Sequence, residues 1–89
     1  MKDLELSGSF KRDLKKIAKR GWNLNKLDAI VTRLRTGTPL LANARPHKLT
    51  GEWLGFWECH VEPDWLLIYD TNGTKVLLAR TGTHTDLFE

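Results

Sequence analysis

Residues 65–79 read WLLIYDTNGTKVLLA, and this stretch sets the centre of the predicted fold. Trp65–Tyr69 is continuously apolar, which is typical of a strand that is buried on both faces. Asn72-Gly73 is a strong signal for a two-residue hairpin turn, and Val76–Ala79 has the composition of the returning strand. The stretch therefore predicts an antiparallel pair of strands at the centre of a sheet.

The hairpin register predicts which side chains meet at the other end of these two strands. A two-residue loop pairs Asp70 with Lys75, and opposite charges at such a pair stabilise a sheet. The same register sets Trp65 opposite Arg80, so the guanidinium would lie close to Asp64.

A third strand precedes this hairpin, because apolar and polar residues alternate from Gly55 to Val61. Pro63 forces a bend directly after this strand. His60 and Asp64 would therefore share one rim of the sheet. The alternation directs Phe56, Glu58 and His60 to one side of the sheet and Trp57, Cys59 and Val61 to the other.

The N-terminal half predicts a short strand followed by two amphipathic helices. The strand would span residues 2–7, and apolar residues then recur with helical spacing from Phe10 to Gly21. A second helix would begin at Asn23 or Asn25 and end within residues 36–39. Two short helices with a tight link form a hairpin that packs its apolar side on the sheet. The predicted fold class is α+β, in a single domain over residues 1–89.

Positive charge is concentrated in the first half of the chain. Residues 1–45 hold eleven Lys and Arg against four Asp and Glu, a net charge of +7, and residues 46–89 carry a net charge of −4. Such an excess of positive charge in one part of a small protein attracts polyanions.

Cys59 is the single cysteine, so an internal disulfide is excluded and a reducing cytoplasm is the expected compartment. The sequence has no secretory signal and no apolar run of about 20 residues, so no contact with a membrane is expected.

All three histidines, His47, His60 and His84, lie in the C-terminal half with Asp64 and Arg80. Imidazole both donates and accepts protons near neutral pH. Cleavage of RNA by its own 2′-hydroxyl needs a base for that proton, an acid for the leaving oxygen, and a fixed cation for the phosphorane charge. The five residues are therefore candidate catalytic groups for cutting a phosphodiester. His84 would return toward Arg80 through a flexible glycine-containing tail.

Candidate substrate-binding residues are aromatic rings and cations. Phe88 is the better stacking candidate, since it has little core to join. Trp65 is a second candidate, although its place in a buried strand favours a core role. The basic residues of an isolated helix most often only face solvent. Beside a candidate catalytic cluster, an RNA contact becomes a better explanation for them. The lysines of this helix are Lys11, Lys15, Lys16 and Lys19.

Other chemistries fit the sequence less well. Three histidines could bind zinc, but no HExxH or HxH spacing is present and a nearby arginine would oppose a cation. Cys59 and His60 are strand neighbours that point to opposite faces, so they cannot form a dyad.

The segments HKLTGEWLGFWECHVEPDWLLIY (residues 47–69) and RTGTHTDLF (residues 80–88) closely resemble YafQ-type toxins of the RelE/ParE toxin superfamily, which belong to type II toxin–antitoxin systems. The helix pair after a short strand also fits, so the resemblance covers almost the whole chain. It implies a RelE-like α+β fold, with a two-helix hairpin packed on a curved, mainly antiparallel sheet.

The resemblance also implies an activity: a ribosome-dependent endoribonuclease, or mRNA interferase, that cuts messenger RNA in the decoding site and so inhibits translation. It implies neither a metal nor another cofactor. His84 would be the leading general acid, and Asp64, with His47 or His60, would assist proton removal from the 2′-hydroxyl. Which group is the base stays open.

By the same resemblance, Arg80 would stabilise the transition state and Phe88 would orient a base. The implied partners are a DinJ-like antitoxin, the ribosome with its message, and operator DNA through the antitoxin only. Two positions depart from the family pattern: Pro46 stands where an acidic residue is frequent, and Trp57 where a basic one is frequent. Neither departure removes a candidate catalytic group.

A non-catalytic alternative is a degenerate toxin that acts only as an antitoxin-binding and co-repressor module. A helix-hairpin DNA binder fits less well, because the stripe from Leu24 to Leu34 is mostly core. Gyrase poisoning, as in the ParE branch, is a third alternative. It fits less well, because that branch does not rely on this histidine cluster.

Overall fold

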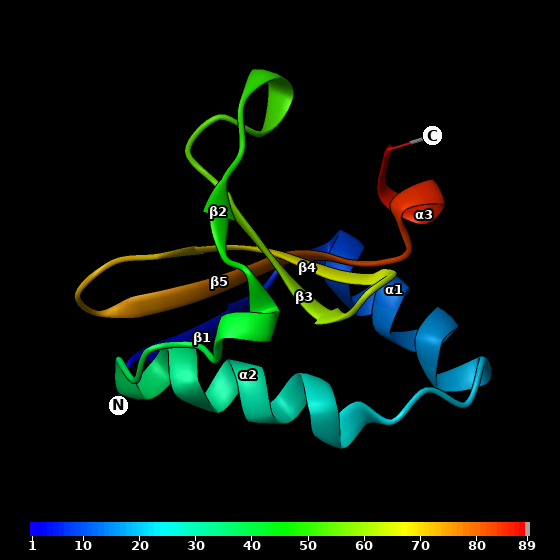
Figure 1. The fold of residues 1–89 in the computed structure, drawn as a ribbon, viewed down its shortest axis with the longest axis horizontal. Helices are drawn as coiled ribbons and strands as arrows, with labels where there is room; N and C mark the ends of the chain where they lie inside the picture. The colour runs from blue at the N-terminus through cyan, green and yellow to red at the C-terminus, as the bar shows by residue number, and fades with distance from the viewer. Residues whose placement is uncertain (89) are drawn as a thin grey trace.

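One mixed sheet of five strands organises the computed structural model, which describes residues 1–88 (Figure 1). The strand order across the sheet is β1-β5-β4-β3-β2. Within the described residues β1 runs parallel to β5 and the other neighbours are antiparallel, which confirms the α+β class and the mainly antiparallel sheet. The strands are β1 Asp3–Leu6, β2 His47–Lys48, β3 Trp57–Glu62, β4 Trp65–Thr71 and β5 Lys75–Gly82.

The helices begin and end at residues with capping chemistry. The Ser7 hydroxyl accepts a hydrogen bond from the Phe10 N–H at 2.9 Å, and the Asn23 side chain caps the second helix. Gly37 ends that helix with a φ of 71°, which glycine adopts without strain. None of the helices in residues 1–88 has the length and apolar character that crossing a membrane requires. The helices are α1 Gly8–Lys19, α2 Leu24–Thr36 and α3 His84–Phe88, with short 3₁₀ turns at Ala42–Ala44 and Gly51–Trp53.

Strand β4 is buried on both faces, as its apolar run predicts. On one face it packs with α1 and α2, and Cys59 of β3 is fully buried in this larger core, where desolvation raises the pKa of its thiol to about 12. On the other face Leu66 and Ile68 pack with Leu87 of α3 and with the aromatic side chains of the β2–β3 loop. Figure 1 shows α2 beneath the sheet, with that loop and α3 rising on the opposite side. We call this opposite side the open face.

The predicted hairpin register is wrong by two positions. Thr71 pairs with Val76 rather than Thr74, and Asp70 does not pair with Lys75. The cause is the Asn72 side chain, whose Oδ1 accepts from the backbone N–H groups of Thr74 at 2.8 Å and Lys75 at 2.9 Å. This local side-chain capping moves the turn one residue along the chain. Lys75 forms its ion pair with Glu5 of β1 instead, at 2.7 Å.

A β-bulge in β5 further changes which side Arg80 faces. Tyr69 pairs with Leu78, but Ile68 pairs with Arg80, so Ala79 is an extra residue on β5. Arg80 therefore lies opposite Ile68, and the predicted pairing with Trp65 is wrong. Because paired residues share a face, the bulge places both Ala79 and Arg80 on the open face.

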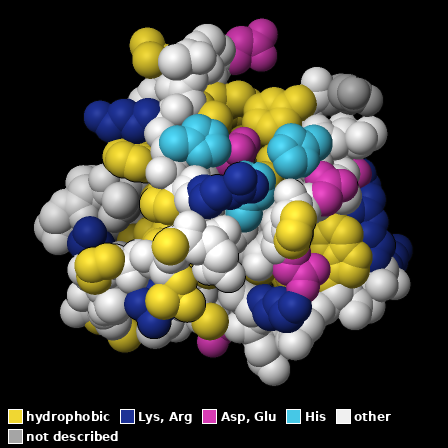
Figure 2. Space-filling view, viewed as in Figure 1, with side chains coloured by type: hydrophobic (Ala, Val, Ile, Leu, Met, Phe, Trp, Pro, Cys, Tyr) yellow, Lys and Arg dark blue, Asp and Glu magenta, His cyan; other side chains and the backbone are white. Residues whose placement is uncertain are grey.

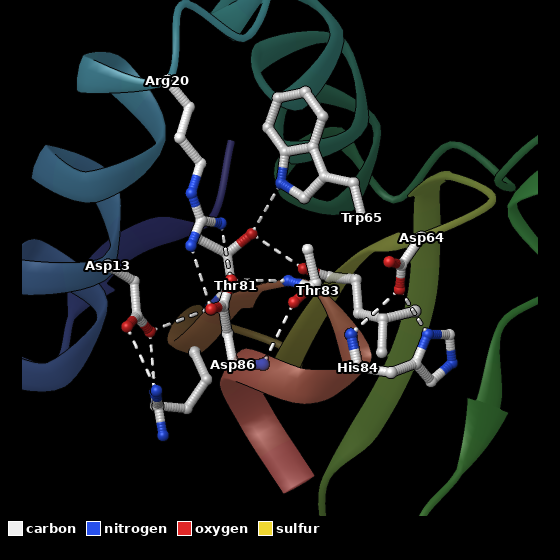
Figure 3. A network of polar contacts seen from close by, with 10 residues as sticks. Asp13, Arg20, Asp64, Trp65, Thr81, Thr83, His84 and Asp86 are labelled. Carbon is white, nitrogen blue, oxygen red and sulfur yellow. Dashed lines mark hydrogen bonds and ion pairs between the residues drawn. The ribbon is translucent and has the colours of Figure 1, made fainter. Parts of the chain in front are cut away.

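The segment after Gly82 is not a flexible tail but the short helix α3. Thr83 and Asp86 form a reciprocal capping pair: the Asp86 N–H donates to the Thr83 hydroxyl and the Thr83 N–H donates to the Asp86 carboxylate, both at 3.0 Å. Arg20, beyond the end of α1, donates two hydrogen bonds to Asp86 at 2.6 and 3.0 Å (Figure 3). A Cβ at Gly82 would lie 2.8 Å from that carboxylate and would displace it, and the φ of 152° also favours glycine there.

The Arg20–Asp86 pair predicts a pH-dependent stability. The hydrogen bonds from Arg20 hold the pKa of Asp86 well below its ordinary value, so the pair stabilises the fold at neutral pH and this stabilisation is lost as pH falls below about 4. We expect Asp86→Asn to lower the free energy of unfolding by about 1 kcal/mol at pH 7. Urea titrations at several pH values would measure it.

The difference between wild type and Asp86→Asn should shrink on acidification. Asp28→Asn on α2 is the matched control, since Asp28 forms no ion pair within residues 1–88. Parallel pH profiles for wild type and Asp86→Asn would contradict this assignment.

Candidate active site

Two adjacent rows of paired residues carry most of the candidate groups across the open face. In one row His47 of β2 pairs with Glu58 of β3, Glu58 with Ile68 of β4, and Ile68 with Arg80 of β5. In the other row His60 pairs with Leu66, which pairs with Gly82 two residues before His84. Histidine side chains accordingly gather on one face of the molecule, with charged side chains between them (Figure 2).

His84 and Asp64 form the tightest contact of this cluster. The imidazole Nδ1 lies 2.6 Å from Asp64 Oδ1, and the His84 backbone N–H donates to the same oxygen at 3.0 Å (Figure 3). Both hydrogen bonds lower the pKa of Asp64, and the one from the His84 backbone has the larger effect. An ionised carboxylate only accepts, so Nδ1 carries the proton and Nε2 is left for another partner. Both side chains are exposed to solvent.

His60 stands beside this pair at the end of β3. Its ring centroid lies 6.1 Å from that of His84, with 47° between the ring planes. The His60 Nδ1 lies 3.3 Å from the Pro63 carbonyl oxygen, which can only accept, so this ring also holds its proton on Nδ1. The bend at Pro63 thus brings His60 and Asp64 to one rim of the sheet, as the sequence predicts.

His47 contacts two acceptors and stands in a different local environment. Its Nδ1 lies 3.1 Å from the Arg45 carbonyl oxygen, and its Nε2 lies 3.3 Å from Glu58 Oε1. A neutral imidazole has one N–H and can donate to only one of these groups. Glu58 is buried, and sequence reasoning missed it as a site residue although it shares a strand face with His60.

Arg80 is held by a residue that sequence reasoning also missed. Its Nε donates to Asp13 Oδ2 at 2.6 Å and its Nη2 donates to Asp13 Oδ1 at 3.1 Å. A hollow of about 300 Å³ opens beside this pair, and Arg12 and Lys16 of α1 contribute to its lining. Arg80 therefore lies on the same sheet face as the histidines, but its immediate neighbours come from α1.

The predicted lysines divide between the two sides of α1. Lys16 lines the hollow at Arg80. Lys11 and Lys15 are about 160° away from Asp13 around the helix axis, at 100° per residue, so they project from the opposite side of α1. Lys19 is exposed and does not line that hollow.

The two aromatic residues predicted to bind substrate differ in their exposure to solvent. Trp65 is only 2% exposed, and its Nε1–H donates to the Thr81 hydroxyl at 2.9 Å, so its ring cannot stack on a base. The prediction of substrate binding by Trp65 is wrong: it is a core residue. Phe88 is 46% exposed, four residues after His84 on the same short helix, and its role in binding stays a prediction.

Comparison with known proteins places these residues in a family. Residues 2–89 match the family described as bacterial toxin of type II toxin-antitoxin system, YafQ. The chain is 43% identical over 88 residues to the mRNA interferase toxin YafQ of Escherichia coli K12, covering 98% of this chain and 96% of that protein.

Solved structures agree with this match. The toxin in the crystal structure of the E. coli DinJ-YafQ toxin-antitoxin complex is 43% identical, with a TM-score of 0.91 over 99% of this chain and 98% of that one. A metal-bound toxin from Helicobacter pylori is 38% identical, with a TM-score of 0.92 over 99% of this chain and all of that one. The chain belongs to the YafQ family of bacterial toxins of type II toxin–antitoxin systems.

Proposed function

We propose that this toxin is a ribosome-dependent endoribonuclease that cleaves messenger RNA in the decoding site without a metal ion. The observation that carries the proposal is the His84–Asp64 pair with His60 beside it on an exposed sheet face. Two imidazoles at this separation can flank one phosphodiester, as an acid and a base for transfer to the 2′-hydroxyl. The relative named mRNA interferase toxin supports the substrate class.

In this mechanism His84 is the general acid. Asp64 holds the Nδ1–H, so in the imidazolium form the second proton is on Nε2, and it is this proton that passes to the leaving 5′-oxygen. The pKa of Asp64 is lowered, so its carboxylate stays ionised at neutral pH and continues to accept the Nδ1–H of His84. Asp64 therefore positions the acid rather than taking the 2′-hydroxyl proton itself.

His60 is the better candidate for the base, because its Nδ1–H faces the Pro63 carbonyl oxygen and its Nε2 lone pair is unoccupied within residues 1–88. His47 lies next to an acceptor at each ring nitrogen, which suits a substrate contact held by Glu58 better than a free base. Arg80 supplies the fixed positive charge that the phosphorane needs. Phe88 and Lys16 flank these groups as contacts for a base and for the phosphate backbone.

The partners follow from the same family membership. A DinJ-like antitoxin would bind this toxin, as DinJ binds YafQ in the E. coli complex. Contact with operator DNA would come through that antitoxin. The cytoplasm, where ribosomes translate, is the proposed location.

Replacing His84 tests the proposed acid. We expect His84→Ala to lower the single-turnover rate of message cleavage on translating ribosomes by about 10²- to 10⁴-fold, the usual contribution of a general acid. Asp64→Asn should lower the same rate, because a neutral amide holds the Nδ1–H of His84 less firmly than a carboxylate does. Asp70→Asn, at the other end of β4, is the matched control and should cleave normally.

Two results would decide against this assignment. Full activity of His84→Ala would remove His84 from the mechanism. Intact message with the wild-type protein, together with tight binding of the antitoxin, would support the non-catalytic module instead.

Removal of metal tests the other part of the proposal, and the metal-bound H. pylori relative makes it a necessary test. Because imidazoles and a guanidinium supply the acid, base and cation, EDTA treatment of the toxin should leave its cleavage rate unchanged. The chelated toxin is exchanged into ribosome buffer before the assay, since ribosomes need magnesium. A loss of activity that zinc or copper restores would contradict the metal-free mechanism.

A further inference from the structure

Asp13 is a buried carboxylate that the proposed mechanism does not use. Its side chain is 9% exposed, yet it lies on α1, a helix whose neighbouring residues are largely cationic. Burying a carboxylate is costly unless hydrogen-bond donors surround it. Within residues 1–88 three donors surround Asp13: Nε and Nη2 of Arg80, and the backbone N–H of Thr81 at 3.1 Å. Figure 3 shows Asp13 beside Thr81.

The fold explains why a carboxylate is needed at this position. Strand β1 pairs with β5 only over residues 75–78, so among the described residues 1–88 no strand pairs with the edge of β5 beyond Leu78. Helix α1 runs along that edge, and Asp13 accepts the N–H that a strand would otherwise bind. The same carboxylate then reaches the guanidinium of the preceding residue, Arg80.

The hydrogen bonds to Asp13 determine which N–H groups of Arg80 remain available to bind a substrate. Asp13 occupies Nε and one N–H of Nη2, which form one edge of the guanidinium fork. The second edge consists of Nη1 and the other N–H of Nη2, and Nη1 has no hydrogen-bond partner within residues 1–88. Two parallel N–H groups of this kind fit a pair of phosphate oxygens. The hydrogen bond to Asp13 also raises the pKa of Arg80, so the cation is permanent.

We infer that Asp13 is a positioning residue, which fixes the guanidinium of Arg80 so that its Nη1–Nη2 edge binds the oxygens of the scissile RNA phosphate. This role rests on the proposed ribonuclease function. Asp13 itself does not touch the substrate. Its effect on the rate is exerted entirely through Arg80.

A double-mutant cycle separates this role from a purely structural one. We expect Asp13→Asn to lower the maximal single-turnover rate of cleavage on programmed ribosomes by about 10- to 100-fold, the effect of a misplaced catalytic group. The toxin concentration that gives half of the maximal rate should change little. In an Arg80→Ala background, Asp13→Asn should change the rate by less than about twofold.

Two further variants keep this test decisive. Ile17→Val, one turn further along α1 in the same core, is the control for loss of packing and should cleave at the wild-type rate. Arg80→Lys keeps the charge but cannot be held as a fork, so it should be as slow as Asp13→Asn. A wild-type rate for either Asp13→Asn or Arg80→Lys would overturn the inference, as would equal effects of Asp13→Asn in both backgrounds.

The free toxin offers a readout that does not depend on cleavage. In ¹H–¹⁵N spectra the Nε–H signal of Arg80 should exchange slowly with water in the wild type and Ile17→Val and rapidly in Asp13→Asn. Equal exchange in Asp13→Asn and wild type would contradict the positioning role. If the wild type fails to cleave on ribosomes, the proposed function fails, whereas normal cleavage by Asp13→Asn refutes the positioning role alone.

Discussion

Burial of β4 on both faces is the constraint on which the rest of this structure depends. Five consecutive large side chains from Trp65 to Tyr69 are almost completely removed from water, and burial of one such side chain stabilises a fold by about 1.5–3 kcal/mol. Alternate residues of one strand face opposite ways, so both sides of the sheet must be covered. Helices α1 and α2 cover one side with the larger core. The smaller cover on the other side leaves part of that face exposed.

The candidate site occupies this exposed part, and its position follows from how the second face is covered. Leu87 anchors α3 over Leu66 and Ile68, and this packing holds the first residue of α3 beside the bend that carries Asp64. The Thr83–Asp86 capping pair and Arg20 then fix the start of α3. A rigid helix start, rather than a mobile chain end, therefore presents His84 to the bend.

Patterning predicted the elements of the fold but not the details of the hairpin. Apolar periodicity located α1, α2 and the strands β1, β3, β4 and β5, because burial repeats every 3.6 or every two residues. It did not locate β2 or α3, which are too short to show a period. The predicted hairpin register was wrong because Asn72 accepts hydrogen bonds through its side chain, which competes with the two-residue turn that Asn-Gly favours. The bulge at Ala79 has no recognisable pattern of apolar and polar residues in the sequence. The face of the sheet on which Arg80 lies therefore could not be predicted.

The site was predictable as a set of residues and only partly as a set of contacts. Chemistry and family resemblance selected the three histidines, Asp64 and Arg80. The partners that orient these side chains, Glu58 and Asp13, come from other strands and helices, and no local spacing indicates them. The Thr-x-x-Asp pattern of Thr83 and Asp86 was visible and would have predicted α3.

The central physical claim is that protein acceptors hold the Nδ1 protons of His60 and His84, leaving their Nε2 atoms for RNA. Long-range ¹H–¹⁵N spectra of the imidazoles, recorded at about pH 8 where unperturbed rings are neutral, measure this directly. We expect both rings as the Nδ1–H tautomer, with unprotonated Nε2. Protons on Nε2 in both rings would contradict the claim, because Asp64 and the Pro63 carbonyl oxygen would then not hold the two rings.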